Sequence, residues 1–442
     1  MSNKDLLGTS FQCECGREHA VPTRHFHYDS DAIKYLGTTI GQYVSEPEYV
    51  ILADERTYEV AGRLVESYLR AANTPVSSFI VPDKDGHSPV TDTATRDFIL
   101  REAPSASAYI AVGSGVINDL TKWIAFENRK PFFSFATAAS MNGYSSANVA
   151  ASVDGLKVLY HGSPSKGVFA IPGIIEAAPF ELTTSGLGDA LAKPVSSADW
   201  KLNQILFDEY YCQFSVNLLD SLVAELLEKP ARIAGRHPEA IQTLFETLFY
   251  SGVVMTMVGT SVPASGGEHL ISHTIDMISA VQGKEHDYHG RQVGVGTILS
   301  AALYEWALSM ESPDFQTPGL ETARDFWGPL SDVVEQEFVK KGPKYELAVQ
   351  KLSQPGAWDN VRAILNDLLV PPRRIKECLK QAGGAHRVSD LRVDGRALPL
   401  DQFLDVFRYA YQMRERFTIL DLCVLLGITD TQMREIVTQW AM

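Results

Sequence analysis

The arrangement of apolar segments in the first 177 residues restricts the fold of this 442-residue chain more than any other feature. Short runs with the pattern of buried strands lie at 48–54, 77–82, 107–115 and 131–137. Amphipathic helical patterns separate them, at 58–72, 95–103 and 116–126. Strands that alternate with helices in this way form a parallel sheet covered by helices. The order predicts a doubly wound α/β domain of the dinucleotide-binding type.

A hairpin and then a change of pattern follow the fourth strand. The run ANVAASVDGLKVLYH contains two β-prone segments joined by Asp154-Gly155, which is a strong two-residue turn signal. The segment 167–172 is expected to return to the sheet. From residue 178 onward long helical periodicities replace the strand patterns. We therefore predict an α/β NAD(P)-binding domain over residues 1–177 and an all-α domain, for metal and substrate, over residues 178–442.

The composition is that of an acidic globular protein. Hydrophobic residues make up 45% of the chain and charged residues 21%, a balance that does not indicate disorder. The formal net charge of −15 argues against a nucleic-acid partner, because phosphate backbones are bound by concentrated Lys/Arg surfaces. The N-terminus lacks a basic segment followed by an apolar core, and no stretch approaches the roughly 20 apolar residues of a membrane span. We expect no membrane span and a cytoplasmic location.

The five cysteines do not suggest a disulfide framework, because they are odd in number and scattered along the chain, at positions 13, 15, 212, 378 and 423. Cys13 and Cys15, with His19 nearby, form the one group that suggests a metal or redox site. Two cysteines and one histidine are a weak signal, so a structural or incidental role is the simpler interpretation.

A glycine loop between a strand and a helix is the first candidate for ligand binding. In VGSGVINDLTKW the backbone N–H groups around Gly113, Ser114 and Gly115 can approach a pyrophosphate at the positive end of the helix. Asn118 stands where the third glycine of a GxGxxG fingerprint would be, and a glycine turn after a strand is also common for steric reasons. Asp54 ends the first strong strand, where it can bind an adenosine ribose or cap the next helix.

An acid and three histidines in the second half carry the candidate metal chemistry. SGLGDALAK contains Asp189 and, one turn later, Lys193, and Asp189 can equally be a helix N-cap. GGEHLISH places His269 and His273 on one helix face, as in HExxH peptidases. Leu270 follows His269, however, and Glu268 precedes it and is expected to point elsewhere, so the peptidase interpretation fails.

His289, in KEHDYHGRQVGVG, also precedes a helical run. One aspartate and two histidines at such junctions can make a three-ligand site with an open position, the arrangement of catalytic zinc. Each of these residues taken alone is more often structural.

Six motifs together resemble one family. They are GSGVINDLTKW, FATAASMNGYSSA, SGLGDALAK followed by DW, GGEHLISH, HGRQVGVG and RERFTILDLCVLLGI. In this order they are similar to the sn-glycerol-1-phosphate dehydrogenases, within the larger group of glycerol dehydrogenases, iron-dependent alcohol dehydrogenases and dehydroquinate synthases. The resemblance covers residues 45 to 435 or so.

The resemblance implies a dehydroquinate synthase-like fold, with NAD or NADP bound by the α/β domain and one divalent metal in the cleft beside the helical domain. The implied metal ligands are Asp189, His269 and His289, with zinc expected and nickel or iron as alternatives. The residues expected to contact the cofactor are Asp54, Gly113, Ser114, Gly115, Asp119, Thr137, Ser140 and Ser146. His273 matches a histidine near the nicotinamide, which makes it the candidate proton relay. We also expect a homo-oligomer.

In this interpretation the metal lowers the pKa of a substrate hydroxyl, so that hydride can pass to the nicotinamide. Lys193 stands where related alcohol dehydrogenases have a further histidine, and a lysine can meet an anionic substrate group. This favours a phosphorylated polyol, sn-glycerol 1-phosphate, with dihydroxyacetone phosphate as the ketone. The alternative is that Lys193 only neutralises Asp189. Asp54 favours NADH over NADPH, although Arg56 can offset its charge.

One departure from the family leaves the exact substrate open. Asn142 stands where the family has an aspartate beside the substrate, and asparagine cannot accept a proton from a hydroxyl. We keep Asn142 as a catalytic candidate together with His273 and Lys193. The rivals are a glycerol dehydrogenase-like enzyme for another polyol, a dehydroquinate synthase-like cyclase and a non-catalytic homologue. The cyclases share the acid-then-lysine pattern, but their acid is a glutamate.

Overall fold

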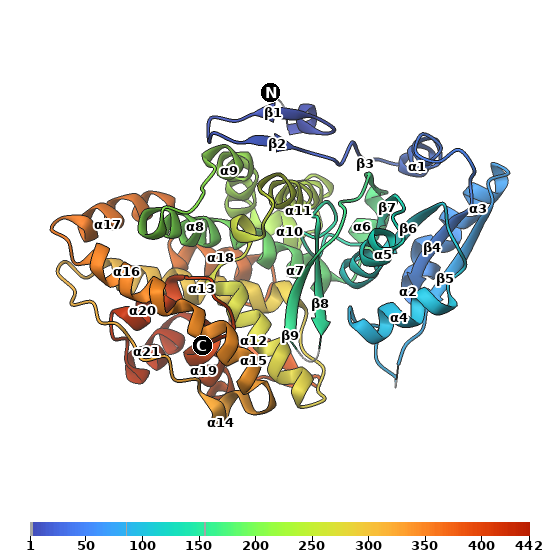
Figure 1. Ribbon diagram of the computed structural model, residues 1–442. Coiled ribbons are helices and arrows are strands. Elements are labelled where there is room, and N and C mark those ends of the chain that lie inside the picture. Colours follow the sequence, from blue (N-terminus) through green and yellow to red (C-terminus); the bar gives the residue numbers. More distant parts are fainter. Residues whose placement is uncertain (1–2, 85, 154–155) are drawn as a thin grey trace. The chain divides into compact units, whose positions relative to one another are not determined.

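The computed structural model describes residues 3–84, 86–153 and 156–442, and the chain divides into two compact units (Figure 1). The first unit comprises Met1–Gly186 and Gly235–Ser261, and the second comprises Leu187–Ala234 and Val262–Met442. Each unit is described by itself below. The domain boundary after residue 177 stays a prediction, because compact units need not be domains that fold independently.

The first unit is built on a six-stranded sheet in which every pairing is parallel. In sheet order the strands are β3 (His25–Tyr28), β10 (Gly167–Ala170), β7 (Phe132–Ala136), β6 (Ala108–Gly113), β4 (Tyr49–Asp54) and β5 (Val76–Val81). The four strands expected from the sequence are all present, and the predicted α/β class is confirmed. Because the strands are parallel, their carboxyl ends share one edge of the sheet, which is where such folds bind ligands.

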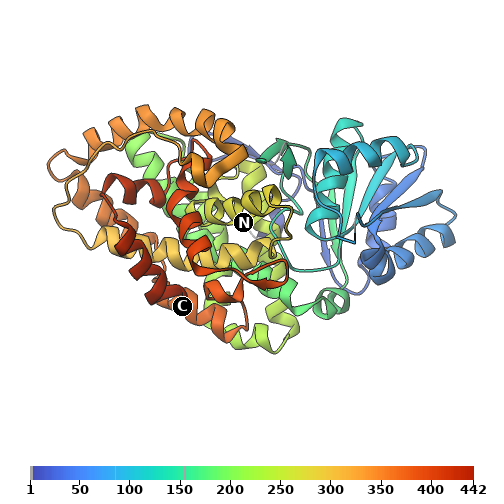
Figure 2. The same ribbon diagram turned by 90° about the horizontal axis from the view of Figure 1, so that it is seen from below.

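Helices cover both faces of this sheet (Figure 2). Alternate residues of β4 point to opposite faces. Ile51 packs with α1 (Ala32–Ile40) and α3 (Arg63–Ala71), whereas Leu52 packs with α4 (Thr93–Glu102) and α5 (Gly115–Glu127). Burial on both faces explains why the central strands read as nearly continuous apolar runs.

Two further strand pairs lie outside the main sheet. β8 (Asn148–Val153) and β9 (Leu156–His161) are antiparallel, as the sequence predicts, and the turn signal Asp154-Gly155 lies outside the described residues. β1 (Ser10–Gln12) and β2 (Glu18–Ala20) form an N-terminal hairpin that the sequence did not predict. The edge strand β3 was also missed, because HFHY is short, polar and only partly buried.

Helix α11 (Pro238–Val258) belongs to the first unit, although its sequence lies between segments of the second. The Phe26 ring in β3 stacks on Phe249 with 4.1 Å between centroids and on Phe245 with 6.0 Å. By length and composition α11 could cross a membrane, which the sequence analysis did not anticipate. Its most apolar window is 78% buried within the protein, however, as in the core helix of a globular domain.

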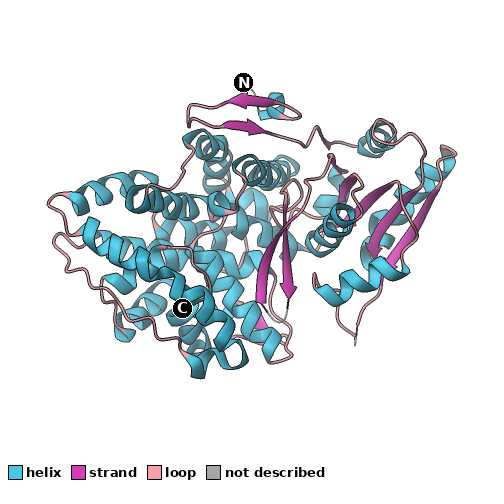
Figure 3. Ribbon diagram, in the orientation of Figure 1, coloured by secondary structure: helices cyan, strands magenta, loops and turns pink. Residues whose placement is uncertain are grey.

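The second unit is almost entirely helical (Figure 3). Its main helices are α8 (Lys193–Phe207), α9 (Gln213–Glu228), α12 (Gly267–Val281), α13 (His289–Leu308), α16 (Gly342–Leu352), α17 (Ala357–Leu368), α18 (Pro372–Gln381), α19 (Leu400–Tyr409), α20 (Ile419–Leu425) and α21 (Asp430–Ala441). Two-residue strands, β11 (Arg392–Val393) and β12 (Arg396–Ala397), interrupt the expected all-helical pattern. Helices α12 and α13 are buried on nearly all sides and form the centre of the unit.

Candidate metal and cofactor sites

Three side chains with metal-ligand chemistry meet in the second unit. Asp189 lies in the last turn of α7 (Phe180–Leu191), His269 lies in the first turn of α12, and His289 is the first residue of α13. One ligand atom of each lies within 4.8 Å of those of the other two. Asp189 and His269 are buried, and His289 is partly exposed. The structure therefore brings the predicted acid and two histidines together, and their role as ligands stays a prediction.

A glycine allows Asp189 to come this close to the start of α13. A Cβ atom at Gly188 would lie 2.0 Å from the carbonyl oxygen of Gly290, so any other residue would force the two segments apart. Gly290 directly follows His289. Because Asp189 lies inside α7 and not at its start, the alternative that Asp189 is a helix N-cap is wrong.

Glu268 orients the His269 ring. Its Oε1 atom lies 2.8 Å from His269 Nδ1 and also accepts a hydrogen bond of 2.7 Å from the Gly266 backbone. Nδ1 donates to this carboxylate, so the lone pair is on Nε2, which lies 3.7 Å from Asp189 Oδ1. Ligand bonds of about 2.1 Å in a tetrahedral zinc site place two ligand atoms about 3.4 Å apart. The expectation that Glu268 points elsewhere was wrong.

His289 is oriented in the same way. The Ser272 hydroxyl donates to Gln292 Oε1 at 2.7 Å, so its oxygen accepts the hydrogen of His289 Nδ1 at 3.1 Å. The lone pair of the His289 ring is then on Nε2. Partners of this kind fix the tautomer and the ring orientation of histidine ligands.

His269 and Asp189 are in the protonation states that metal binding requires. Burial lowers the pKa of His269 to about 3, so its ring is neutral. Burial alone would raise the pKa of Asp189, but Lys193, His269 and His289 together hold it below its ordinary value, so the carboxylate is charged. A neutral imidazole beside a charged carboxylate is a suitable donor pair for a divalent cation.

Replacing Glu268 with alanine is expected to weaken metal binding by roughly 10- to 100-fold, the usual cost of losing the partner of a metal-bound histidine. Metal retention against a chelator series, read by elemental analysis, measures this. Glu268→Gln keeps an acceptor for Nδ1 and should lose less, and Glu305→Ala, exposed on α13, is the matched control. Equal retention by Glu268→Ala and the control would contradict the assigned role.

Asp199 ties the start of α12 to its neighbours, a role that the sequence analysis did not assign. Its carboxylate accepts from the backbone of Gly267 at 2.7 Å, from the Tyr304 hydroxyl at 2.5 Å and from the backbone of Ile419 at 2.7 Å. Burial raises the pKa of Asp199 to about 7, with a further contribution from Glu268. The available signal was the DW pair that follows SGLGDALAK, in which Asp199 is the acid.

Lys193 pairs with the predicted acid. Its Nζ atom lies 3.2 Å from Asp189 Oδ1 and 3.3 Å from the carbonyl oxygen of Ala264, and the side chain is 3% exposed. This is the ion pair that the neutralising alternative predicts. An ammonium group has three donors, and these two contacts leave the third for an anionic substrate oxygen. The substrate role of Lys193 therefore stays a prediction.

His273 lies next to the ligand cluster, with its ring 5.4 Å from that of His289 and 6.0 Å from that of His269. It also belongs to a second group with ligand atoms within 4.8 Å, formed with Asp276 and His289. Asp276 already pairs with His286 at 3.0 Å. His289 is common to both groups, so metal retention after substitution of His273 or His269 distinguishes them.

The predicted cofactor residues gather at the carboxyl edge of the sheet in the first unit. Ser114, which precedes α5, bonds to Ser140 through their hydroxyl groups. Thr137 follows β7 and donates its N–H to the Gly113 carbonyl oxygen at 3.1 Å. Gly115 begins α5, whose first N–H groups have no partner within the helix and suit an anion. These residues fit a pyrophosphate, and this role stays a prediction.

Asp119 and Ser146, also predicted to contact the cofactor, are held by a lysine that the sequence analysis did not single out. Lys122 is fully buried and donates to Asp119 at 2.9 Å, to Ser146 at 3.4 Å and to the carbonyl oxygens of Gly143 and Asn148. The contacts of Asp119 and Ser146 with Lys122 therefore stabilise the loop around residues 143–148, whether or not these two residues also bind a ligand. A lysine on the buried face of a helix was the signal for this network.

Asp54 acts as the helix cap that the sequence analysis kept as an alternative. Its side chain accepts from the Thr57 backbone at 2.8 Å. Arg56 lies 3.4 Å from Asp54 and forms two hydrogen bonds of 2.8 and 2.9 Å with Asp83. The Arg56 guanidinium is therefore paired mainly with the Asp83 carboxylate. Helix capping does not test whether Asp54 also binds a ribose, so that role stays a prediction.

Asn142 lies in a loop that is fastened to α11. Ser145 donates to the Phe249 carbonyl oxygen at 2.5 Å, and Thr256 bonds to both Ala147 and Ser145 at 2.9 Å. Asn142 itself is partly exposed. The loop is thus held firmly, and whether Asn142 contacts substrate stays a prediction.

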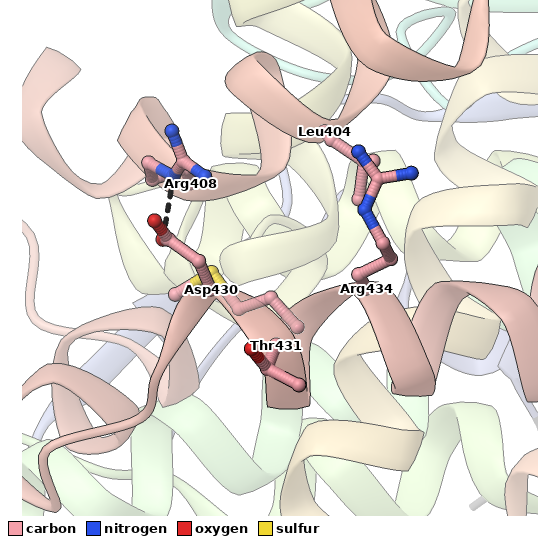
Figure 4. A pocket seen from close by; sticks show the side chains of 6 residues that line it. Leu404, Arg408, Asp430, Thr431 and Arg434 are labelled. Carbon is pink, nitrogen blue, oxygen red and sulfur yellow. Dashed lines mark ion pairs between the residues drawn. The ribbon is translucent and has the colours of Figure 1, made fainter.

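The second unit also has a small hollow that is lined by other residues (Figure 4). It lies between α19 and α21 and is lined by Leu404, Arg408, Asp430, Thr431, Met433 and Arg434. An ion pair of 2.7 Å joins Arg408 and Asp430 across it. None of the predicted site residues lines it, so it supports no role in the predicted chemistry.

Comparison with known proteins identifies the family. The family model described as iron-containing alcohol dehydrogenase matches residues 27–179. A glycerol-1-phosphate dehydrogenase [NAD(P)+] of Halalkalibacterium halodurans is 28% identical over 422 residues, which cover 94% of this chain and 96% of the relative. Another, from Pyrococcus furiosus, is 33% identical over 261 residues, which cover 59% of this chain and 72% of the relative. The chain belongs to the glycerol-1-phosphate dehydrogenase family.

The resemblance inferred from the six motifs is therefore confirmed. Solved structures agree on the fold. Glycerol dehydrogenase from Schizosaccharomyces pombe superposes with a TM-score of 0.60 at 15% identity, covering 94% of this chain and 91% of its own. Sulfoacetaldehyde reductase from Bifidobacterium kashiwanohense superposes with a TM-score of 0.57 at 15% identity, covering 96% and 98%. At such low identity these likenesses show the fold alone.

Proposed function

We propose that this chain is a metal-dependent, NAD(P)-linked dehydrogenase that interconverts sn-glycerol 1-phosphate and dihydroxyacetone phosphate. The observation that carries the proposal is the close approach of Asp189, His269 and His289, with Lys193 paired to the acid. It occurs in a member of the glycerol-1-phosphate dehydrogenase family. Carboxylate and imidazole donors suit a divalent metal of the zinc, nickel or iron type, and we propose zinc.

The candidate site residues of the second unit have different roles in this proposal. Asp189, His269 and His289 would hold the metal, and Glu268 keeps the His269 lone pair on Nε2. When bound, the metal acts as a Lewis acid toward the substrate oxygen, and the nicotinamide exchanges hydride with the substrate carbon. Lys193 binds the substrate phosphate through its remaining N–H group. His273 delivers or removes the hydroxyl proton.

The first unit would hold the cofactor at the carboxyl edge of its sheet. The start of α5, with Gly113, Ser114 and Gly115, would bind the pyrophosphate, and Thr137 and Ser140 would line the cofactor. We propose a preference for NADH. The pairing of Arg56 with Asp83 supports it, because this arginine is then less able to attract a 2′-phosphate beside Asp54. A homo-oligomer and a cytoplasmic location stay predictions.

The proposal predicts that the purified chain oxidises NADH when dihydroxyacetone phosphate is supplied, with one glycerol 1-phosphate formed per NADH consumed. The absorbance of NADH or NADPH is followed with chelator-treated protein before and after addition of Zn²⁺, Ni²⁺ or Fe²⁺. Activity should return only with metal. Phosphate release without net cofactor oxidation from a dehydroquinate synthase substrate would point to the cyclase, and oxidation of unphosphorylated glycerol at equal efficiency would point to a glycerol dehydrogenase.

A further inference from the structure

The N-terminal hairpin brings two thiols and an imidazole together, apart from the chemistry proposed above. Cys13 and Cys15 lie in the turn between β1 and β2, and His19 lies in β2. Ligand atoms of these three residues lie within 4.8 Å of one another. Both cysteines are partly exposed, whereas His19 is 1% exposed. Soft sulfur donors beside an imidazole are the ligand set of structural zinc.

The hairpin backbone places these donors. Cys13 donates its N–H to the Arg17 carbonyl oxygen at 3.0 Å, and Gly16 donates to the Cys13 carbonyl oxygen at 2.9 Å. Gly16 has a φ of +84°, a conformation that glycine adopts without strain, and it turns the chain so that Cys15 faces β2. Cys15 Sγ then lies 3.3 Å from His19 Nε2. Bonds of about 2.3 Å to sulfur and 2.05 Å to nitrogen in a tetrahedral zinc site separate such atoms by about 3.6 Å.

A distant backbone carbonyl fixes the state of the His19 ring. His19 Nδ1 lies 2.9 Å from the carbonyl oxygen of Met257, in the last turns of α11. A carbonyl oxygen only accepts, so Nδ1 carries the hydrogen and Nε2 presents its lone pair to the sulfur atoms. A histidine bonded in this way to a backbone carbonyl is the usual arrangement of a zinc ligand.

We propose that Cys13, Cys15 and His19 bind a structural zinc ion, separate from the metal at Asp189. The ion would fasten a hairpin whose strands have three residues each, too few for independent stability, and would couple it to α11 through His19. Both thiols lose their protons to solvent on binding, and no oxidation is involved. The fourth position of the tetrahedron is filled by water or by a further side chain, which a count of sulfur ligands decides.

Zinc counts in variants of each site distinguish the two proposed metal sites. Protein produced with added zinc is expected to contain two zinc equivalents by elemental analysis, and Cys15→Ser and His19→Gln should each contain one. His289→Ala should also contain one, but with intact sulfur ligation. Cys378→Ser, in α18, is the control for loss of a thiol outside the hairpin. The hairpin variants should keep cofactor-linked turnover but unfold at a lower temperature than this control.

A thiol-specific mercurial provides a test that does not depend on folding of a variant. Titration of wild-type protein in the presence of a zinc indicator should release one equivalent, and His289→Ala should release the same amount. X-ray absorption of His289→Ala should show two sulfur ligands, or three if Cys212 also binds, which Cys212→Ser decides. Release of no zinc by the mercurial, absence of sulfur ligands, or a Cys13–Cys15 disulfide in freshly purified protein would overturn the proposal.

Discussion

His289→Ala is expected to remove the catalytic metal and the activity together. His289 belongs to both groups of ligand atoms in the second unit, so its loss disrupts either arrangement. Turnover should fall by roughly 10³-fold or more, since a Lewis-acid metal supplies several kcal/mol of transition-state stabilisation. Metal content by elemental analysis and kcat from NADH oxidation measure the two effects on the same preparation.

The neighbouring histidine should behave differently. His273→Ala is expected to lower kcat by about 10²- to 10⁴-fold, the usual contribution of general acid–base catalysis, while metal content stays near that of wild type. His269→Ala is the matched comparison, because it should lose the metal. If His273→Ala loses the metal and His269→Ala keeps it, then Asp276 and not Asp189 is the acidic ligand, and the assignment made here is wrong.

Lys193→Met is expected to lower kcat/KM for dihydroxyacetone phosphate by roughly 10- to 100-fold, because a hydrogen bond to a charged group contributes about 1.5–3 kcal/mol. Unphosphorylated dihydroxyacetone lacks the anion, so its much lower kcat/KM should be nearly unchanged by the substitution. Lys201→Met, two turns further along α8, is the control for removing a lysine from this helix.

The alternative role of Lys193 gives a distinct result. If the lysine only neutralises Asp189, its loss leaves a buried carboxylate without its closest cation, and metal content should change. Both ketones should then lose kcat/KM by the same factor. A selective loss for the phosphorylated ketone with constant metal content would assign Lys193 to the substrate.

Much of the first unit follows from local sequence patterns. Strands such as 49–54 and 108–113 are largely apolar because helices bury both faces of the sheet. The glycine loop at Gly113 correctly predicts the start of α5. The edge strand β3 could not be predicted in this way. HFHY carries no apolar run, and it becomes a strand because β10 supplies its hydrogen-bond partners. Strand pairing of this kind is a property of the neighbour as much as of the segment itself.

Helix α11 illustrates the same limit at a larger scale. Its periodicity predicts a long apolar helix, and that helix exists. Periodicity does not state what the apolar face packs against. The contacts of Phe245 and Phe249 with Phe26, more than 200 residues earlier in the chain, place the helix in the first unit.

The candidate metal site was likewise predicted only in part from the sequence. Residue types and order bring forward Asp189, His269 and His289 as candidates, and the family resemblance implies that they are the ligands. The structure brings the three side chains together. Glu268 was dismissed because adjacent residues on a helix face different directions. At the first turn of α12, however, its flexible side chain reaches both the Gly266 backbone and His269 Nδ1. Local geometry at a helix terminus therefore overrides the simple rule of helical faces.

The sequence by itself determined the alternating α/β pattern, the helical second half, the family and the identity of the candidate ligands, because each depends on residue type and spacing along the chain. Only the tertiary structure decided which residues hold these ligands in place and in which protonation state. The His269 tautomer depends on the side-chain conformation of Glu268 in the same helix. The His289 tautomer and the charge of Asp189 depend on groups supplied by other helices. The same holds for Cys13, Cys15 and His19, a weak pattern in the sequence that becomes a candidate zinc site once the Met257 carbonyl directs the His19 lone pair toward sulfur.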